Sequence, residues 1–221
     1  MKDYPIHERL HIGMLLAMAA GGFDAYTYLQ HGEVFAGLQT GNLILLGIHI
    51  AKGDLSIIVR YLVPILSFLL GTIIVRFVQQ RFEKSDTRRN RQVSILLWEM
   101  LLVLIVTVAA AHIPNMASSA LVSLVAAAQL QEFRKLKGGP FTSLMMTGNL
   151  RTLGESYLDA VTEHSAKARE KGNDTLAIIV SFVVGAALMG LMVAWLTNAA
   201  IVLTLVPLGI TTYLISTNKA K

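Results

Sequence analysis

One acidic residue lies inside an apolar stretch of the chain and is the strongest candidate for chemistry. Asp24 follows the apolar residues 12–23 and is flanked by small residues at Gly21, Gly22 and Ala25. An ionisable side chain within a membrane span has to face a cavity or a partner, so it is a functional candidate. We expect Asp24 either to contact a solute or exchange protons, or to act as a structural carboxylate that binds backbone groups of a neighbouring segment.

A Thr-Gly-Asn motif occurs twice, in TGNLILLG at 40–47 and in TGNLRTLG at 147–154. Thr or Asn can cap the start of a helix, and Gly allows a turn or a close backbone approach. A helix N-terminus inside the membrane also presents free N–H groups and a partial positive charge. The two copies therefore predict a substrate-binding site, or, in the plainer interpretation, two helix starts buried in protein. The candidate substrate-binding residues are Asp24, Thr40, Gly41, Asn42, Gln131, Thr147, Gly148 and Asn149.

Three more polar residues lie in or beside apolar stretches. Gln131 falls opposite Asp24 when the two motif copies are aligned, and its amide can hydrogen-bond to a solute. Glu132 is interpreted as a residue at the cytoplasmic interface. Glu99 lies inside another apolar stretch, so Asp24 and Glu99 are the candidates for proton coupling. The alternative for Glu99 is structural pairing with an arginine.

The residue types exclude several kinds of chemistry. The sequence has no cysteine, so it forms no disulfide and no thiolate metal site. It contains no nucleophile–base arrangement, phosphate-binding loop or zinc helix motif. We therefore expect no enzymatic activity, no cofactor and no metal.

The elements that must position these residues are membrane-spanning helices. Of the 221 residues, 54% are hydrophobic and 15% are charged, whereas soluble domains carry about 25% charged residues. A hydrocarbon core of about 30 Å requires about 20 apolar residues in a helix, and lipid excludes unpaired backbone groups. The predicted spans are residues 12–23, 57–75, 93–111, 115–130, 175–196 and 198–215.

The sequence also contains an internal repeat. Besides the Thr-Gly-Asn motif, SFLLG at 67–71 corresponds to SFVVG at 181–185, in the same order. We predict two internal repeats at about 8–111 and 113–216 within a single transmembrane domain, 1–221. Small residues at helical spacing predict close helix packing, namely Ala17, Gly21, Gly71, Gly185, Ala186 and Gly190.

The positions of Lys and Arg predict the orientation of the helices. As a helix, segment 41–52 is only about 18 Å long, too short to cross the membrane. If it re-enters on one face, both termini and the basic loop 79–92 become cytoplasmic, with Lys52 alone on the other side. The formal net charge of +5 is therefore interpreted as an orientation signal and not as nucleic-acid binding.

These observations predict an all-α polytopic membrane protein. It has six transmembrane helices in two inverted three-helix repeats, each with a broken or re-entrant Thr-Gly-Asn segment. In the alternative, both short segments span, which gives eight helices and parallel repeats.

Three segments carry a resemblance to a known family: GGFDAYTYL (21–29), VFAGLQTGNLILLG (34–47) and MMTGNLRTLG (145–154). Over nearly its whole length the chain resembles the YoaK-like family of bacterial integral membrane proteins, a domain of unknown function. The resemblance implies a multi-pass protein of the bacterial inner (plasma) membrane, with Asp24, Asn42 and Asn149 at motif positions. That family commonly carries Gln-Asn-Ala in its second half; this chain has Gln-Glu-Phe at 131–133, so no role of an Asn there carries over.

The leading functional hypothesis is a small-solute membrane transporter, coupled to protons in one form of the hypothesis. Its site would lie near the midplane between the two Thr-Gly-Asn segments. The alternatives are an aquaporin-like channel and a membrane protein that transports nothing. The partners expected are a small-molecule solute, protons and membrane lipids, with no nucleic acid; a homo-oligomer is compatible with all three.

Overall fold

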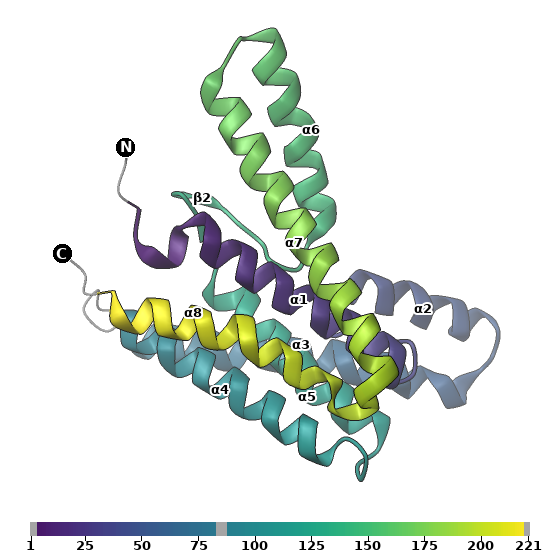
Figure 1. The fold of residues 1–221 in the computed structure, drawn as a ribbon. Helices are drawn as coiled ribbons and strands as arrows, with labels where there is room; N and C mark the ends of the chain where they lie inside the picture. Colours follow the sequence, from purple (N-terminus) through teal and green to yellow (C-terminus); the bar gives the residue numbers. More distant parts are fainter. Residues whose placement is uncertain (1–3, 83–87, 219–221) are drawn as a thin grey trace.

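The computed structural model describes residues 4–82 and 88–218, and most of them are helical (Figure 1). The all-α prediction is confirmed, apart from one short hairpin. Residues 83–87 of the predicted basic loop, together with Lys2, Lys219 and Lys221, lie outside the described residues. In chain order the elements are η1 (Ile6–Glu8), α1 (Leu10–Gln30), α2 (Gln39–Ala51), α3 (Leu55–Arg81), α4 (Arg88–Ala109), α5 (Asn115–Glu132), β1 (Lys135–Leu136), β2 (Gly139–Pro140), α6 (Met146–Thr162), α7 (Ala166–Leu196), η3 (Thr197–Thr204) and α8 (Leu205–Thr217).

Four stretches of the described chain are long and apolar enough to cross a membrane. The last of them joins α7, η3 and α8 and contains both predicted spans of that region. Helix α5 covers the predicted span 115–130 but is not one of the four, because serine, glutamine and glutamate side chains make it more polar. The four stretches are Leu10–Gln30, Ser56–Arg81, Arg88–Ala109 and Ala166–Thr217.

The outward faces of the long helices are apolar. Leu69 and Ile73 on α3, and Val183 and Leu191 on α7, are each more than half exposed. The inward faces form a common core in which side chains such as Phe23 are fully buried. Large apolar side chains on the outside are expected when the surrounding solvent is hydrocarbon.

Helices α1 and α7 pack so closely that glycines are required at their contact. A Cβ on Gly21 would overlap the carbonyl oxygen of Phe182, and a Cβ on Gly185 would overlap that of Met18. Residue numbers rise together along the two helices, since Gly13 lies beside Ile178 at one end of the contact. The two helices therefore run parallel, and the prediction of close packing at Gly21 and Gly185 is confirmed.

Helices α3 and α5 form a second close contact. A Cβ on Gly71 would lie 2.9 Å from Ala127 Cβ and 3.1 Å from the carbonyl oxygen of Leu124. Gly71 thus has the predicted packing role. The prediction was wrong for Gly190, where an added Cβ would meet no other atom within 4 Å because this residue lies away from α1.

The polar contacts at the helix ends give the relative directions of the remaining helices. Gln79, near the end of α3, contacts Glu132 at the end of α5, so α3 and α5 are parallel. Arg91, near the start of α4, pairs with the same Glu132, so α4 is antiparallel to α5. Arg89 of α4 donates to the carbonyl oxygen of Asn218 beyond α8, so α4 is also antiparallel to α8.

The hairpin β1–β2 connects α5 to the second Thr-Gly-Asn motif. Lys137 and Gly138 at its turn have φ values of 47° and 78°, as expected for a two-residue turn that follows the strand twist. The Lys137 ammonium lies 2.7 Å from a Glu170 carboxylate oxygen and 2.6 Å from one of Asp174, both on α7. Glu8 accepts the Gly138 N–H at 2.9 Å. The hairpin is therefore fastened to both η1 and α7.

Candidate functional site at the junction of the two motif segments

Asp24 binds the backbone of the loop that precedes α2. It is 6% exposed, and its Oδ1 accepts the Gly37 N–H at 2.6 Å and the Leu38 N–H at 3.3 Å. The chain reverses after α1 through Gly32 and Glu33, with φ values of 86° and 57°, which brings the loop back alongside the helix. Asp24 therefore has the structural role that the sequence allowed, as a carboxylate that compensates two backbone donors.

Asn42 is fully buried and holds the same loop. Its Oδ1 accepts the Phe35 N–H at 2.9 Å, and its Nδ2 donates to the Phe35 carbonyl oxygen at 2.7 Å and to Gln39 Oε1 at 2.9 Å. The predicted capping role was wrong, because α2 has its N-cap at Leu38 with no side-chain cap bond, and Thr40 is exposed.

Gly41 packs against the ring of Phe35, where an added Cβ would lie 2.9 Å from Cδ2. This position permits the close approach that the sequence predicted for the glycine of the first motif. The loop is thus held from both sides, by the Asn42 amide and by this contact.

The second motif repeats part of this arrangement. Asn149 Nδ2 donates to the Thr142 carbonyl oxygen at 3.1 Å, again seven residues earlier in the chain. Helix α6 has its N-cap at Met145 without a side-chain cap bond, so Thr147 does not cap it. Thr147 and Gly148 are exposed. In both copies the Asn side chain therefore binds a carbonyl oxygen seven residues earlier and so fixes the loop that precedes the helix.

The two loops meet each other at Gly37 and Leu144. A Cβ on Gly37 would overlap the side chain of Leu144, which is buried with Ser143 in the loop before α6. Gln129 of α5 donates to Ser143 Oγ at 2.7 Å and to the Leu16 carbonyl oxygen of α1 at 3.0 Å. The junction therefore joins α1, α5 and both loops.

Gln129 links α5 to the second loop as Asp24 links α1 to the first, although Gln129 donates to a side chain and Asp24 accepts backbone N–H groups. Gln129 was not among the residues predicted for the site. At the fixed offset between the two motif copies, Asp24 falls opposite Gln131 instead. The helical spacing of the buried face of α5 is the signal that could have found Gln129, through Ser118, Val122, Val125, Gln129 and Glu132.

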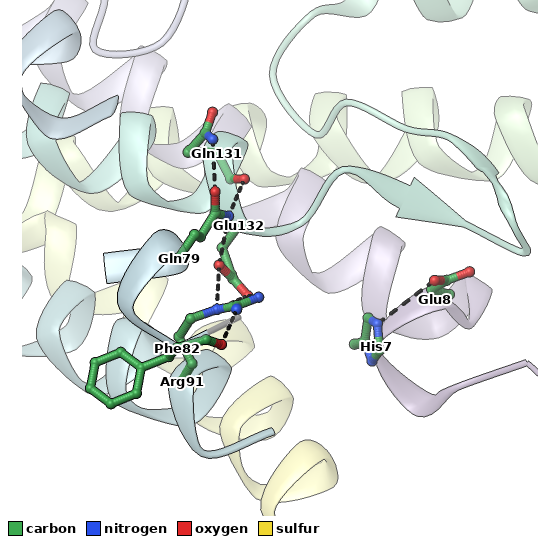
Figure 2. Close-up of polar contacts among 7 residues, drawn as sticks. All are labelled: His7, Glu8, Gln79, Phe82, Arg91, Gln131 and Glu132. Atoms are coloured by element: carbon green, nitrogen blue, oxygen red, sulfur yellow. Dashed lines mark hydrogen bonds and ion pairs between the residues drawn. The ribbon is translucent and has the colours of Figure 1, made fainter. Parts of the chain in front are cut away.

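Gln131 belongs to a different cluster, at the C-terminal end of α5 (Figure 2). It donates to Gln79 Oε1 at 2.9 Å, and Gln79 Nε2 donates to the Gln131 carbonyl oxygen at 3.0 Å and to Glu132 Oε2 at 2.9 Å. The Glu132 side chain has no exposed surface and lies 2.9 Å from Arg91 Nη2. Glu132 is therefore a buried member of an ion pair, and its position at the cytoplasmic interface stays a prediction.

Glu99 lies on the inward face of α4 and is fully buried. Neither of its carboxylate oxygens has a hydrogen-bond partner among the described residues. The structural alternative, pairing with an arginine, is therefore wrong within residues 4–82 and 88–218.

A groove of about 320 Å³ lies beside the junction, between α1, α7 and the loop before α2. Asp24 and Ala25 line it from α1, Phe35 from the loop, and Phe182 and Ala186 from α7. Asp24 is the carboxylate of this otherwise largely apolar lining. Over the described ranges, no group of three or more His, Asp or Glu side chains could hold a metal ion.

A bundle of long helices with apolar outward faces defines a multi-pass transmembrane protein. The chain belongs to the family described as "Protein of unknown function (DUF1275)", whose model matches residues 12–214. It is 26% identical over 143 residues to the "UPF0700 transmembrane protein YoaK" of Bacillus subtilis (strain 168), and the match covers 64% of each chain. The resemblance found in the sequence is thereby confirmed. No solved structure matches the chain.

Proposed function

We propose that the protein is a small-solute membrane transporter whose site is the groove beside the junction of the two motif segments. The observation that carries this proposal is the contact of Gly37 with Leu144 beside Asp24, because it brings non-helical backbone of both halves together inside the bundle. Irregular backbone at membrane depth is tolerated where it is buried in protein or lines a cavity. Transporters use such broken segments for their binding sites.

The packing of the helices supports two repeats. Helix α1 packs on α7, as α5 packs on α3, and the short helices α2 and α6 pack on α3 and α7. Gly71 and Gly185, matched in the sequence repeat, each lie at the close contact with the first helix of the other half. Asn42 and Asn149 each reach back seven residues. In each half, the first helix would thus pack on a helix of the other half, as expected for a duplicated fold.

The helix directions support inversion of the two repeats. Helices α4 and α8 occupy equivalent places in the two halves and are antiparallel. Parallel repeats with eight spans would make equivalent helices parallel instead. Helix α2 has 13 residues, about 20 Å of helix, which is short for a span. We therefore favour six spans with two re-entrant segments.

The distribution of charge supports cytoplasmic termini. Arg89 and Arg91 lie at the end of the bundle that also holds the end of α8, and the positive-inside rule assigns that end to the cytoplasm. In this orientation the first loop enters from outside and α2 returns outward, while the second loop enters from the cytoplasm and α6 returns inward. The two loops would then meet inside the membrane, between α2 and α6.

The groove gives the proposed site its chemistry. A solute in the groove would lie against Asp24, whose Oδ1 already fixes the loop through Gly37 and Leu38. Binding or release of a solute would therefore change the bonds that hold the first loop to α1. A ligand that interacts differently with two loop positions shifts their populations, which is what a carrier requires.

Uptake into proteoliposomes tests this function. The purified chain is reconstituted, the vesicles are incubated with an isotopically labelled bacterial metabolite extract, and accumulated solutes are identified by mass spectrometry. We expect saturable uptake that falls severalfold in Leu29→Trp, which narrows the groove, but not in Leu191→Trp on the outer face of α7. Uptake no faster than in protein-free vesicles, or equal uptake by both variants, would contradict the proposal. Flux that never saturates would indicate a channel.

A further inference from the structure

Among the described residues, Glu99 differs from the other buried carboxylates in having no hydrogen-bond partner. Asp24 accepts two backbone N–H groups. Glu132 accepts hydrogen bonds from the guanidinium of Arg91 at 2.9 to 3.2 Å and from Gln79 at 2.9 Å. Glu99 is equally buried, yet neither of its oxygens has a partner among the described residues.

An ionised carboxylate in that position would be an isolated charge. Moving an ionised carboxylate from water into the protein costs on the order of several kcal/mol unless an opposite charge and hydrogen bonds compensate it. Residues 4–82 and 88–218 offer Glu99 neither, whereas a neutral carboxylic acid leaves only ordinary polar atoms buried. The geometry therefore suits a group that holds a proton.

The charged surroundings of Glu99 can be traced on each helix that packs against α4. Helix α5 contributes Glu132, whose charge acts on Glu99 and whose own partner is Arg91 of α4. Helix α8 and η3 contain no Asp, Glu, Lys, Arg or His. Helix α3 contains Arg60, which lies beside Gly32, and Arg76 and Arg81, which are exposed. The charge that acts on Glu99 thus belongs to an ion pair that is already complete.

Other unpaired polar atoms lie on the helix that faces α4. Ser118 Oγ, Ser123 Oγ and Gln129 Oε1, all on α5, are buried without a hydrogen-bond partner among the described residues. Buried polar atoms are usually hydrogen-bonded, so such a group of exceptions calls for a functional explanation. Ser118 and Ser123 thus add unused polar atoms to the buried face of the helix that packs on α4, whereas Gln129 belongs to the junction with α1 and the second loop.

We infer that Glu99 is a proton-binding site within the α4–α5 side of the bundle, distinct from the solute groove. The side chain stays a neutral acid while the Arg91–Glu132 pair is closed. Release of its proton requires a rearrangement that supplies Glu99 with a compensating group. Use of this proton to drive uptake rests on the proposed transport function; the proton site itself does not.

Infrared spectroscopy of the reconstituted full chain at neutral pH tests the site without any solute. We expect a carboxylic-acid C=O band that shifts in D₂O, is lost in Glu99→Gln and is retained in Glu99→Asp. The control Glu163→Gln, at an exposed position, leaves the band unchanged. The helical amide band shows that each variant is folded.

Identical acid bands in the wild type and Glu99→Gln would overturn the inference, because Glu99 would then be ionised. A second measurement separates the two proposals. If the band is present, Glu99→Gln should lose pH-driven accumulation while keeping solute exchange. Loss of the band in Glu99→Gln with no uptake by any form would sustain the proton site and remove the transport function.

Discussion

Gly37 donates its backbone N–H to Asp24 Oδ1 at 2.6 Å, and its α-carbon faces the side chain of Leu144 from the other half of the chain. One residue thus connects α1, the loop before α2 and the loop before α6. A side chain at this position would separate the two loops. The glycine is required by this close approach, since its φ is not in the positive range.

The first prediction concerns the carboxylate at this junction. Asp24→Ala leaves two backbone donors without their acceptor, so the free energy of unfolding should fall by about 1–3 kcal/mol. Asp24→Asn keeps an acceptor oxygen and should lose less. Thermal unfolding in detergent measures both; an equal effect of the two variants would contradict the hydrogen-bonding role of Oδ1.

The second prediction concerns the contact of the loops. Gly37→Ala should destabilise the protein by about 1–3 kcal/mol, the usual cost of overpacking. Because the obstacle is the side chain of Leu144, the double variant Gly37→Ala/Leu144→Ala should recover part of the loss beyond additivity. Strict additivity of the two single variants would show that the loops do not touch.

The third prediction uses two glycines of the same helix. Gly185→Ala forces α7 away from the carbonyl oxygen of Met18 and should lower the melting temperature, by about 2–4 °C for each kcal/mol lost. Gly190→Ala meets no other atom and should change little or slightly stabilise the helix. Equal effects of the two substitutions on the melting temperature would contradict the close contact of α1 and α7 at Gly185.

The fourth prediction concerns pH. His31 follows α1 and is 1% exposed; its Nδ1 lies 3.2 Å from Asn115 Oδ1. Burial lowers the pKa of His31 from its ordinary value of 6.5, although the bond to Asn115 opposes this. The unfolded chain therefore binds more protons near that pH, and stability is present above 6.5 and lost as pH falls below it.

A buried neutral Glu99 contributes a slope of opposite sign to both forms, so the effect of His31 is the difference between the wild type and His31→Gln. As the pH is lowered from about 7.5 to about 5.5, the melting temperature of the wild type should fall relative to that of His31→Gln. Some slope should remain, because burial also lowers the pKa of His7. His164→Gln, at an exposed position, is the control and should leave the slope unchanged. A slope in His31→Gln equal to that of the wild type would rule out His31 as its source.

Several features of the fold could be predicted from the sequence because they depend on local pattern. Apolar runs predict helices in lipid, and the repeated Thr-Gly-Asn motif predicts two related breaks in them. The glycines at 21, 71 and 185 could be assigned to packing because small residues at helical spacing permit close approach.

The partners of the polar side chains could not be predicted in the same way. The loop at 31–38 and the loop at 133–145 differ in length because only the second contains the β1–β2 hairpin. A fixed alignment of the two motifs therefore selected Gln131, whereas the structure uses Gln129. The bonds of Asn42 cross a non-helical loop, which no periodic pattern encodes.

The insertion of the two motif segments from opposite faces can be measured directly, because the chain has no native cysteine. Single cysteines are placed at two exposed positions, Lys52→Cys after α2 and Glu163→Cys after α6, and whole cells are treated with a membrane-impermeant maleimide. Inverted re-entrant segments predict labelling at 52 in intact cells and at 163 only after permeabilisation. Protection of both positions in intact cells is the result expected for eight spans with parallel repeats, and it would contradict the inverted junction.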